Sequence, residues 1–66
     1  MSRFQVFYSA MPEVGSGFRL VAAADAYEAE RVVQREFPGA VTATLSEKVT
    51  DKEEIRQLFL DWLGKI

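Results

Sequence analysis

The spacing of hydrophobic residues changes once along this 66-residue chain and separates strands from a helix. Over residues 4–22, hydrophobic and polar positions alternate with a period of two, which is typical of β-strands. From Asp25 onward the hydrophobic positions recur every three or four residues, as on one side of a helix, until Pro38 and Gly39 end the run. The pattern therefore predicts a hairpin, then a helix, then a third strand.

The alternation assigns side chains to the two faces of the hairpin. In the first strand we expect one face to carry Phe4, Val6, Tyr8 and Ala10, and the other Arg3, Gln5, Phe7 and Ser9. Residues 11–17 should form the connector, because Pro12 restricts the backbone and two glycines permit positive φ. In the second strand we expect an inward face of Phe18, Leu20 and Ala22 and an outward face of Arg19 and Val21.

Asp25 followed by Glu28 has the form of a capping box and predicts the start of a helix. The buried side of that helix should carry Ala26, Ala29, Val33 and Phe37, flanked by Val32. Its exposed side should carry Tyr27, Glu28, Arg31, Gln34 and Arg35. A third strand is expected over residues 40–46, with Val41, Ala43 and Leu45 facing inward and Thr42 and Thr44 facing outward.

Thr50 and Glu53 form a second capping box and predict a last helix. One broad arc of that helix, expected to be buried, carries Ile55, Leu58, Phe59, Trp62, Leu63 and Ile66, whereas Leu60 lies outside it. A right-handed crossover places the third strand beside the first. We therefore predict an α+β fold, ββαβα, with a three-stranded antiparallel sheet of order 2-1-3, two helices and one compact domain over residues 1–66.

The chain contains no cysteine and no histidine, which excludes thiolate and imidazole catalysis and the usual zinc sites. Its paired carboxylates fall on helix exteriors, where water keeps them ionised and unsuited to general acid catalysis. We therefore expect a non-enzymatic protein without cofactor or metal. No apolar run is long enough to span a membrane, and the absence of cysteine fits a cytoplasmic location.

The net charge of −2 is distributed unevenly and leaves the helical parts mildly acidic. Glu53, Glu54 and Asp61 share the polar side of the last helix with Gln57, and Asp51 and Glu47 lie nearby in sequence. Such carboxylates can imitate phosphate spacing and occupy a basic groove on a partner protein. We expect partner contacts from Glu53, Glu54, Asp61, Glu28 and Glu30. The alternative is an ordinary solvated helix face, since acids are favoured near helix N-termini.

Two further hypotheses use other surfaces. The outward sheet face is expected to carry Arg3, Gln5, Phe7, Arg19, Val21, Thr42 and Thr44. Arg3, Phe7 and Arg19 would then allow a small module to bind single-stranded nucleic acid, with the ring stacking a base and the arginines neutralising phosphates. A homodimerising adaptor domain would instead place Phe7, Val21 and Leu60 in a self-interface.

The organisation over residues 4–46 resembles a known class of small proteins from phages and mobile elements. A short hairpin precedes a helix over residues 24–31, of the form Ala-x-x-x-Glu-Ala-x-x, and a strand follows Phe37, Pro38 and Gly39. In this it is similar to some anti-CRISPR inhibitors. The resemblance implies a stoichiometric inhibitor, in the cytoplasm of a bacterial host, that binds a CRISPR effector complex and blocks access to target DNA. These inhibitors share no site motif, so the resemblance assigns no residue.

Overall fold

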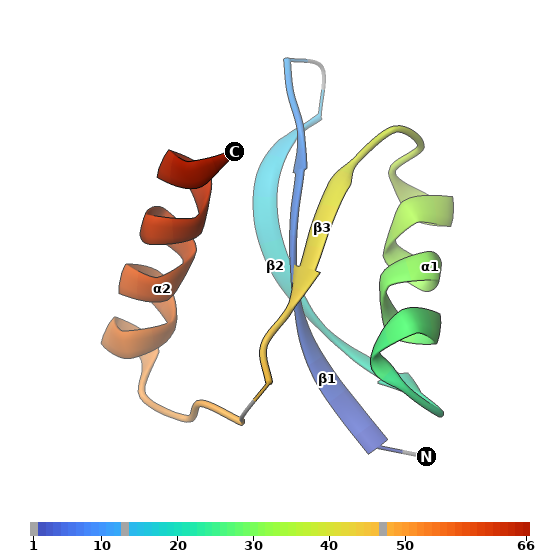
Figure 1. Ribbon diagram of the computed structural model, residues 1–66, viewed down its shortest axis with the longest axis horizontal. Coiled ribbons are helices and arrows are strands. Elements are labelled where there is room, and N and C mark those ends of the chain that lie inside the picture. Colours follow the sequence, from blue (N-terminus) through green and yellow to red (C-terminus); the bar gives the residue numbers. More distant parts are fainter. Residues whose placement is uncertain (1, 13, 47) are drawn as a thin grey trace.

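A computed structural model describes residues 2–12, 14–46 and 48–66 of the chain. The elements, in chain order, are β1 (Ser2–Ala10), β2 (Gly15–Ala23), α1 (Ala26–Glu36), β3 (Val41–Thr44) and α2 (Lys52–Lys65). The three strands form an antiparallel sheet of order β2-β1-β3. Helix α1 covers one face of the sheet and α2 lies on the opposite side (Figure 1). The predicted α+β fold, its ββαβα order and its 2-1-3 strand order are confirmed.

The hairpin connector is shorter than the predicted loop over residues 11–17. Strand pairing continues to the pair Ala10–Gly15, and Gly15 opens β2 with a positive φ of 94°. Gly17 also lies within β2, where the side chain of Tyr8 crosses it: a Cβ at this position would stand 2.8 Å from the Tyr8 hydroxyl. The two glycines therefore extend the hairpin instead of forming a flexible loop.

The predicted faces of β2 and β3 are wrong. The short connector sets a register in which Phe4 lies opposite Val21 and Phe7 opposite Phe18. Opposed residues share a face, so Val21 lies on the same face as Phe4, and Phe18 on the same face as Phe7. Val21 consequently faces α1, and Phe18 faces α2. In β3 the pairs Tyr8–Thr42 and Phe7–Ala43 likewise turn Thr42 toward α1 and Ala43 toward α2. The expected outward face is thus divided between the two sides of the sheet.

The core lies between α1 and the sheet and is built mainly from small side chains. Its buried residues are Val6, Val21, Ala23, Ala29 and Val33, with Phe4, Tyr8 and Phe37 packed against them. Asp25 caps α1 by accepting a hydrogen bond of 2.8 Å from the Glu28 backbone N–H. The alanines on both sides allow α1 to lie close to the sheet, while Tyr8 and Phe37 stack at 4.3 Å between ring centroids.

Helix α2 packs on the other face through aromatic rings. Phe7 lies at the centre, with ring centroids 5.2 Å from Phe59, 5.7 Å from Trp62 and 6.0 Å from Phe18. We call these four residues the aromatic cluster. Of the predicted buried arc of α2, only Ile55 is buried, with 9% of its surface exposed. Phe59, Trp62 and Leu63 are half-buried, and Leu58 and Ile66 are exposed. The large rings hold the helix away from the strands, so its apolar side is only partly covered.

The N-cap of α2 is Asp51 rather than the predicted Thr50. Its carboxylate accepts hydrogen bonds from the backbone N–H groups of Glu53 at 2.9 Å and Glu54 at 3.4 Å. Two backbone N–H groups of the first turn, which have no partner within the helix, are thereby hydrogen-bonded.

Among the helices of the part of the chain that is described, none is long and apolar enough to cross a membrane.

Candidate partner-binding surfaces

The outer side of α2 carries three of the five carboxylates expected to bind a partner. Glu53, Glu54 and Asp61 are all exposed, and their helical spacing places them on the polar side of α2. At the edges of that side, Glu53 borders a hollow that Phe18 also lines, and Asp61 borders one that Phe7 and Trp62 line. Gln57 lies among them and donates a hydrogen bond of 3.1 Å to Asp61. We call Glu53, Glu54, Gln57, Leu60 and Asp61 the outer face of α2.

These carboxylates have no cation at bonding distance within the described parts of the chain. The one ion pair found there joins Arg19 to Glu36, which lie on the other side of the sheet. Lys52, Arg56 and Lys65 also belong to α2, so the helix as a whole is close to neutral. The acidic character of the outer face is therefore local, and solvent-exposed charges of this kind are available to an approaching partner.

The other two carboxylates lie on α1, across the sheet from α2 (Figure 1). Glu30 accepts hydrogen bonds from the hydroxyls of Thr42 at 2.6 Å and Thr44 at 3.1 Å, which ties α1 to β3. Glu28 accepts a hydrogen bond of 3.4 Å from the Ala24 backbone N–H at the start of α1. The structure therefore gives both residues local contacts and does not bring them together with Glu53, Glu54 and Asp61.

The residues of the nucleic-acid hypothesis do not form one surface. Phe7 is 2% exposed and sits in the aromatic cluster, where no base could stack on it. Arg19 lies on the α1 face, pairs with Glu36 and places its guanidinium 5.0 Å from the centroid of Phe37. Arg3 is exposed on the same side of the sheet as Phe7. The expected platform of a ring between two arginines is absent from these three positions.

The residues of the self-interface hypothesis are also separated. Val21 belongs to the core under α1, and Phe7 to the aromatic cluster, so neither is available on the surface. Leu60 is 49% exposed, as its position outside the apolar arc predicts. A dimer that uses Phe7 and Val21 is therefore inconsistent with this fold.

Sequence reasoning missed an exposed apolar surface on β2. Phe18 is 47% and Leu20 is 54% exposed, and both point to the α2 side of an edge strand. The alternation in β2 groups Phe18 with Leu20 correctly, but the prediction places this group on the inward, buried face. The length of the connector, which sets the register, was the signal that could have reversed this assignment.

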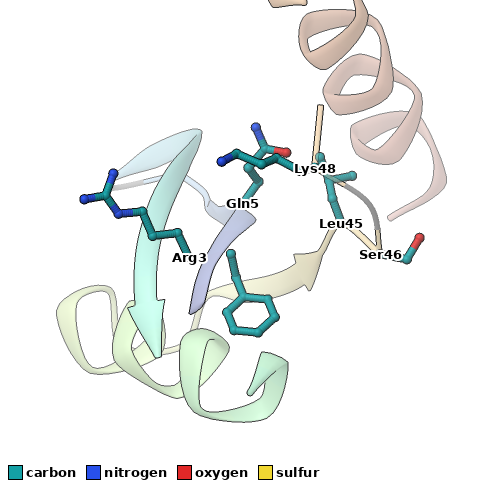
Figure 2. Close-up of a pocket in the computed structure, with 6 residues that line it drawn as sticks. Arg3, Gln5, Leu45, Ser46 and Lys48 are labelled. Carbon is teal, nitrogen blue, oxygen red and sulfur yellow. The ribbon is translucent and has the colours of Figure 1, made fainter. Parts of the chain in front are cut away.

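The described surface carries several open hollows, with volumes of about 120 to 440 Å³. One hollow of about 120 Å³ lies between β1 and the connector from β3 to α2, and it is lined by Arg3, Phe4, Gln5, Leu45, Ser46 and Lys48 (Figure 2). The amide of Gln5 is occupied by the backbone of Val49, which leaves exposed cationic side chains as the main polar groups there. Among the residues described, no group of three or more histidine, cysteine or acidic side chains could hold a metal ion.

Comparison of the chain with protein-family models, with curated proteins and with solved structures found no match.

Proposed function

We propose that this protein is a non-enzymatic, protein-binding inhibitor that acts through the outer face of α2. The observation that supports this most directly is the exposure of Glu53, Glu54 and Asp61 on one side of a helix, without a bonded cation in the described residues. Carboxylates held by a helix keep fixed spacings, and they complement lysine and arginine side chains that line a groove. The partner is therefore a protein with a basic groove.

An exposed leucine favours a protein partner over a nucleic acid. Leu60 lies within one helical turn of Gln57 and Asp61, and half of its surface is accessible. Acidic side chains repel phosphates, whereas a leucine among charges fits the apolar centre of a protein interface that has a polar rim. The outer face of α2 thus combines apolar contact with charge complementarity.

In this proposal the class of partner is a CRISPR effector complex, and the resemblance to anti-CRISPR inhibitors supports that choice. A CRISPR effector complex holds its nucleic acids in a positively charged channel. A carboxylate-bearing helix seated in that channel would exclude target DNA by occupying both its volume and its cations. In this proposal the protein works in the cytoplasm of a bacterial host and inhibits stoichiometrically, without chemistry of its own.

The proposal is tested by affinity capture of the tagged protein from bacterial lysates that contain CRISPR effector complexes, followed by binding measurements on the captured complex. The decisive variant reverses three charges on the outer face, Glu53→Lys, Glu54→Lys and Asp61→Lys. The opposite control, Lys52→Glu with Arg56→Glu, changes charge on the same helix with the other sign. We expect the first to weaken binding by more than roughly tenfold and the second to strengthen it.

The melting temperature of each variant separates binding from folding. Glu53 and Glu54 lie in the first turn of α2, where reversing a charge costs roughly 0.3–1 kcal/mol of stability. A folded triple variant with unchanged affinity would refute the role of the carboxylates. Failure of the unmodified protein to retain any effector subunit would refute the assignment of the partner.

A further inference from the structure

The two edges of the sheet differ in length and in protection. Strand β3 is an edge of only four residues, Val41–Thr44, whereas β2 is an edge of nine, Gly15–Ala23. Within the described parts of the chain, β2 pairs with β1 alone, so its outer row of backbone N–H and C=O groups has no strand beside it. A long edge of this kind is a template for another strand.

Strand β2 lacks the features that usually prevent edge pairing. It contains no proline and one charged residue, Arg19, whose guanidinium is directed to Glu36 and Phe37 on the α1 side. On the α2 side its exposed side chains include Phe18 and Leu20, which are apolar. Nothing in this sequence repels an approaching strand, and two large side chains would be covered by one.

The shape of the molecule leaves the edge accessible. Its dimensions are 32 × 27 × 15 Å. The shortest dimension, 15 Å, runs across the three strands of the sheet. Two spacings of about 4.8 Å between neighbouring strands account for most of it. Viewed along that direction, α1 and α2 lie on either side of the sheet, and over most of its length neither ribbon overlaps the strands (Figure 1). The outer edge of β2 consequently lies on a broad face of a thin molecule.

The exposed surface is larger than expected for a monomer of this mass. The chain exposes 4721 Å², whereas a folded monomer of 7.5 kDa exposes about 4250 Å² on average. Val6 and Val33 are the largest side chains that are fully buried. Domains of this size commonly supplement a small core by oligomerisation. Both observations favour a partner that covers additional apolar surface.

We propose that two copies of this chain pair through their β2 strands, antiparallel, to form a continuous six-stranded sheet. In such a pair, two opposed residues lie on the same face of the sheet, and side chains alternate between the faces. The twofold axis between two identical strands therefore passes beside one residue, which opposes its own counterpart in the other copy. Centring on Arg19 would oppose two like charges, which is destabilising. Centring on Leu20 opposes Arg19 with Val21, Phe18 with Ala22, and each Leu20 with its counterpart.

The pairing centred on Leu20 matches Phe18 with the smaller Ala22 and covers Leu20, the most exposed large apolar side chain of β2. It requires no other sequence, because β2 is its own complement. Both copies keep α1 on one face of the joined sheet and α2 on the other, with the outer face of α2 still exposed. This inference therefore stands independently of the proposed inhibitory function.

Cysteine crosslinking tests the register directly, since the chain has no native cysteine. At the centre of the pairing, the two Cα atoms of Leu20→Cys would lie at a separation that a disulfide can bridge. The matched control is Val41→Cys, which is similarly exposed and on the same face, but at the other edge of the sheet. Under mild oxidation, we expect Leu20→Cys to form a crosslinked dimer at least roughly tenfold faster than Val41→Cys.

Sedimentation equilibrium provides the second measurement. The unmodified protein and Val41→Lys should dimerise with similar affinity, and Leu20→Lys, which opposes two ammonium groups, should dimerise at least roughly tenfold more weakly. Circular dichroism checks that each variant folds; should Leu20→Lys not fold, the crosslinking decides. A monomer at every concentration, a dimer lost in Val41→Lys instead, or equal crosslinking of both cysteine variants would overturn the proposal. A β2 edge that pairs only with a strand of another protein would also overturn it.

Discussion

The side-chain amide of Gln5 forms two hydrogen bonds with the backbone of Val49. Its Nε2 donates to the Val49 carbonyl over 2.6 Å, and the Val49 N–H donates to its Oε1 over 2.9 Å. The amide thus pairs with the connector as a neighbouring strand would. Because Gln5 lies in β1 and Val49 shortly precedes α2, this contact holds the connector against the sheet and sets where α2 begins.

Replacing Gln5 with alanine should lower the free energy of unfolding by about 1–3 kcal/mol, because both half-buried backbone groups of Val49 lose their partners. The single tryptophan, Trp62, reports the packing of α2, so its fluorescence during denaturation measures the effect. Gln57→Ala is the control, since it removes an exposed amide and one surface hydrogen bond. Equal stability of the two variants would contradict an anchoring role for Gln5.

Two glycines in different environments should respond oppositely to alanine. Gly17→Ala would place a Cβ 2.8 Å from the Tyr8 hydroxyl and displace a ring that stacks on Phe37, so we expect a loss of about 1–3 kcal/mol. Gly64, near the end of α2, has no atom within 4 Å of a built Cβ, and Gly64→Ala should stabilise by up to about 1 kcal/mol. Thermal unfolding of the two variants measures both signs. A stabilising Gly17→Ala would show that Tyr8 does not cover this position.

The start of α2 can be assigned by two neighbouring substitutions. Asp51→Ala removes the acceptor for the Glu53 and Glu54 N–H groups and should cost about 1 kcal/mol. Thr50→Ala should cost much less, because the exposed Thr50 side chain makes none of the helix-capping hydrogen bonds. Chemical denaturation compares the two. A larger loss for Thr50→Ala would restore the capping box that the spacing of Thr50 and Glu53 predicts.

The order of the elements could be predicted from the sequence because it depends on local signals. The change of period, the Asp25 cap, and the handed crossover together determine ββαβα and the strand order. The faces of β2 could not be predicted in the same way. Both sides of the sheet are covered by a helix, so hydrophobic side chains occur on both, and alternation alone does not show which side Val21 occupies.

The candidate surfaces were predictable where they depend on one helix and not where they depend on contacts distant in sequence. Helical spacing alone places Glu53 and Asp61 on a common exposed side. The role of Glu30 depends on Thr42 and Thr44, which β3 brings to α1 only in the folded chain. The exposure of Phe18 and Leu20 depends on register and on how far the aromatic cluster holds α2 from the sheet.

The aromatic cluster makes a final prediction about how firmly α2 is attached. Trp62 is half-buried and contacts Phe7 and Phe59, so Trp62→Ala should cost roughly 2–3 kcal/mol, less than the 3–5 kcal/mol typical of a fully buried aromatic. Leu60→Ala, on the outer face of the same helix, should cost well under about 1 kcal/mol. Thermal unfolding by circular dichroism compares them, since one variant lacks the fluorophore. Equal losses would mean that α2 does not pack through these rings. Because a small domain has little stability in reserve, Trp62→Ala should also raise the fraction of molecules in which α2 is detached from the sheet.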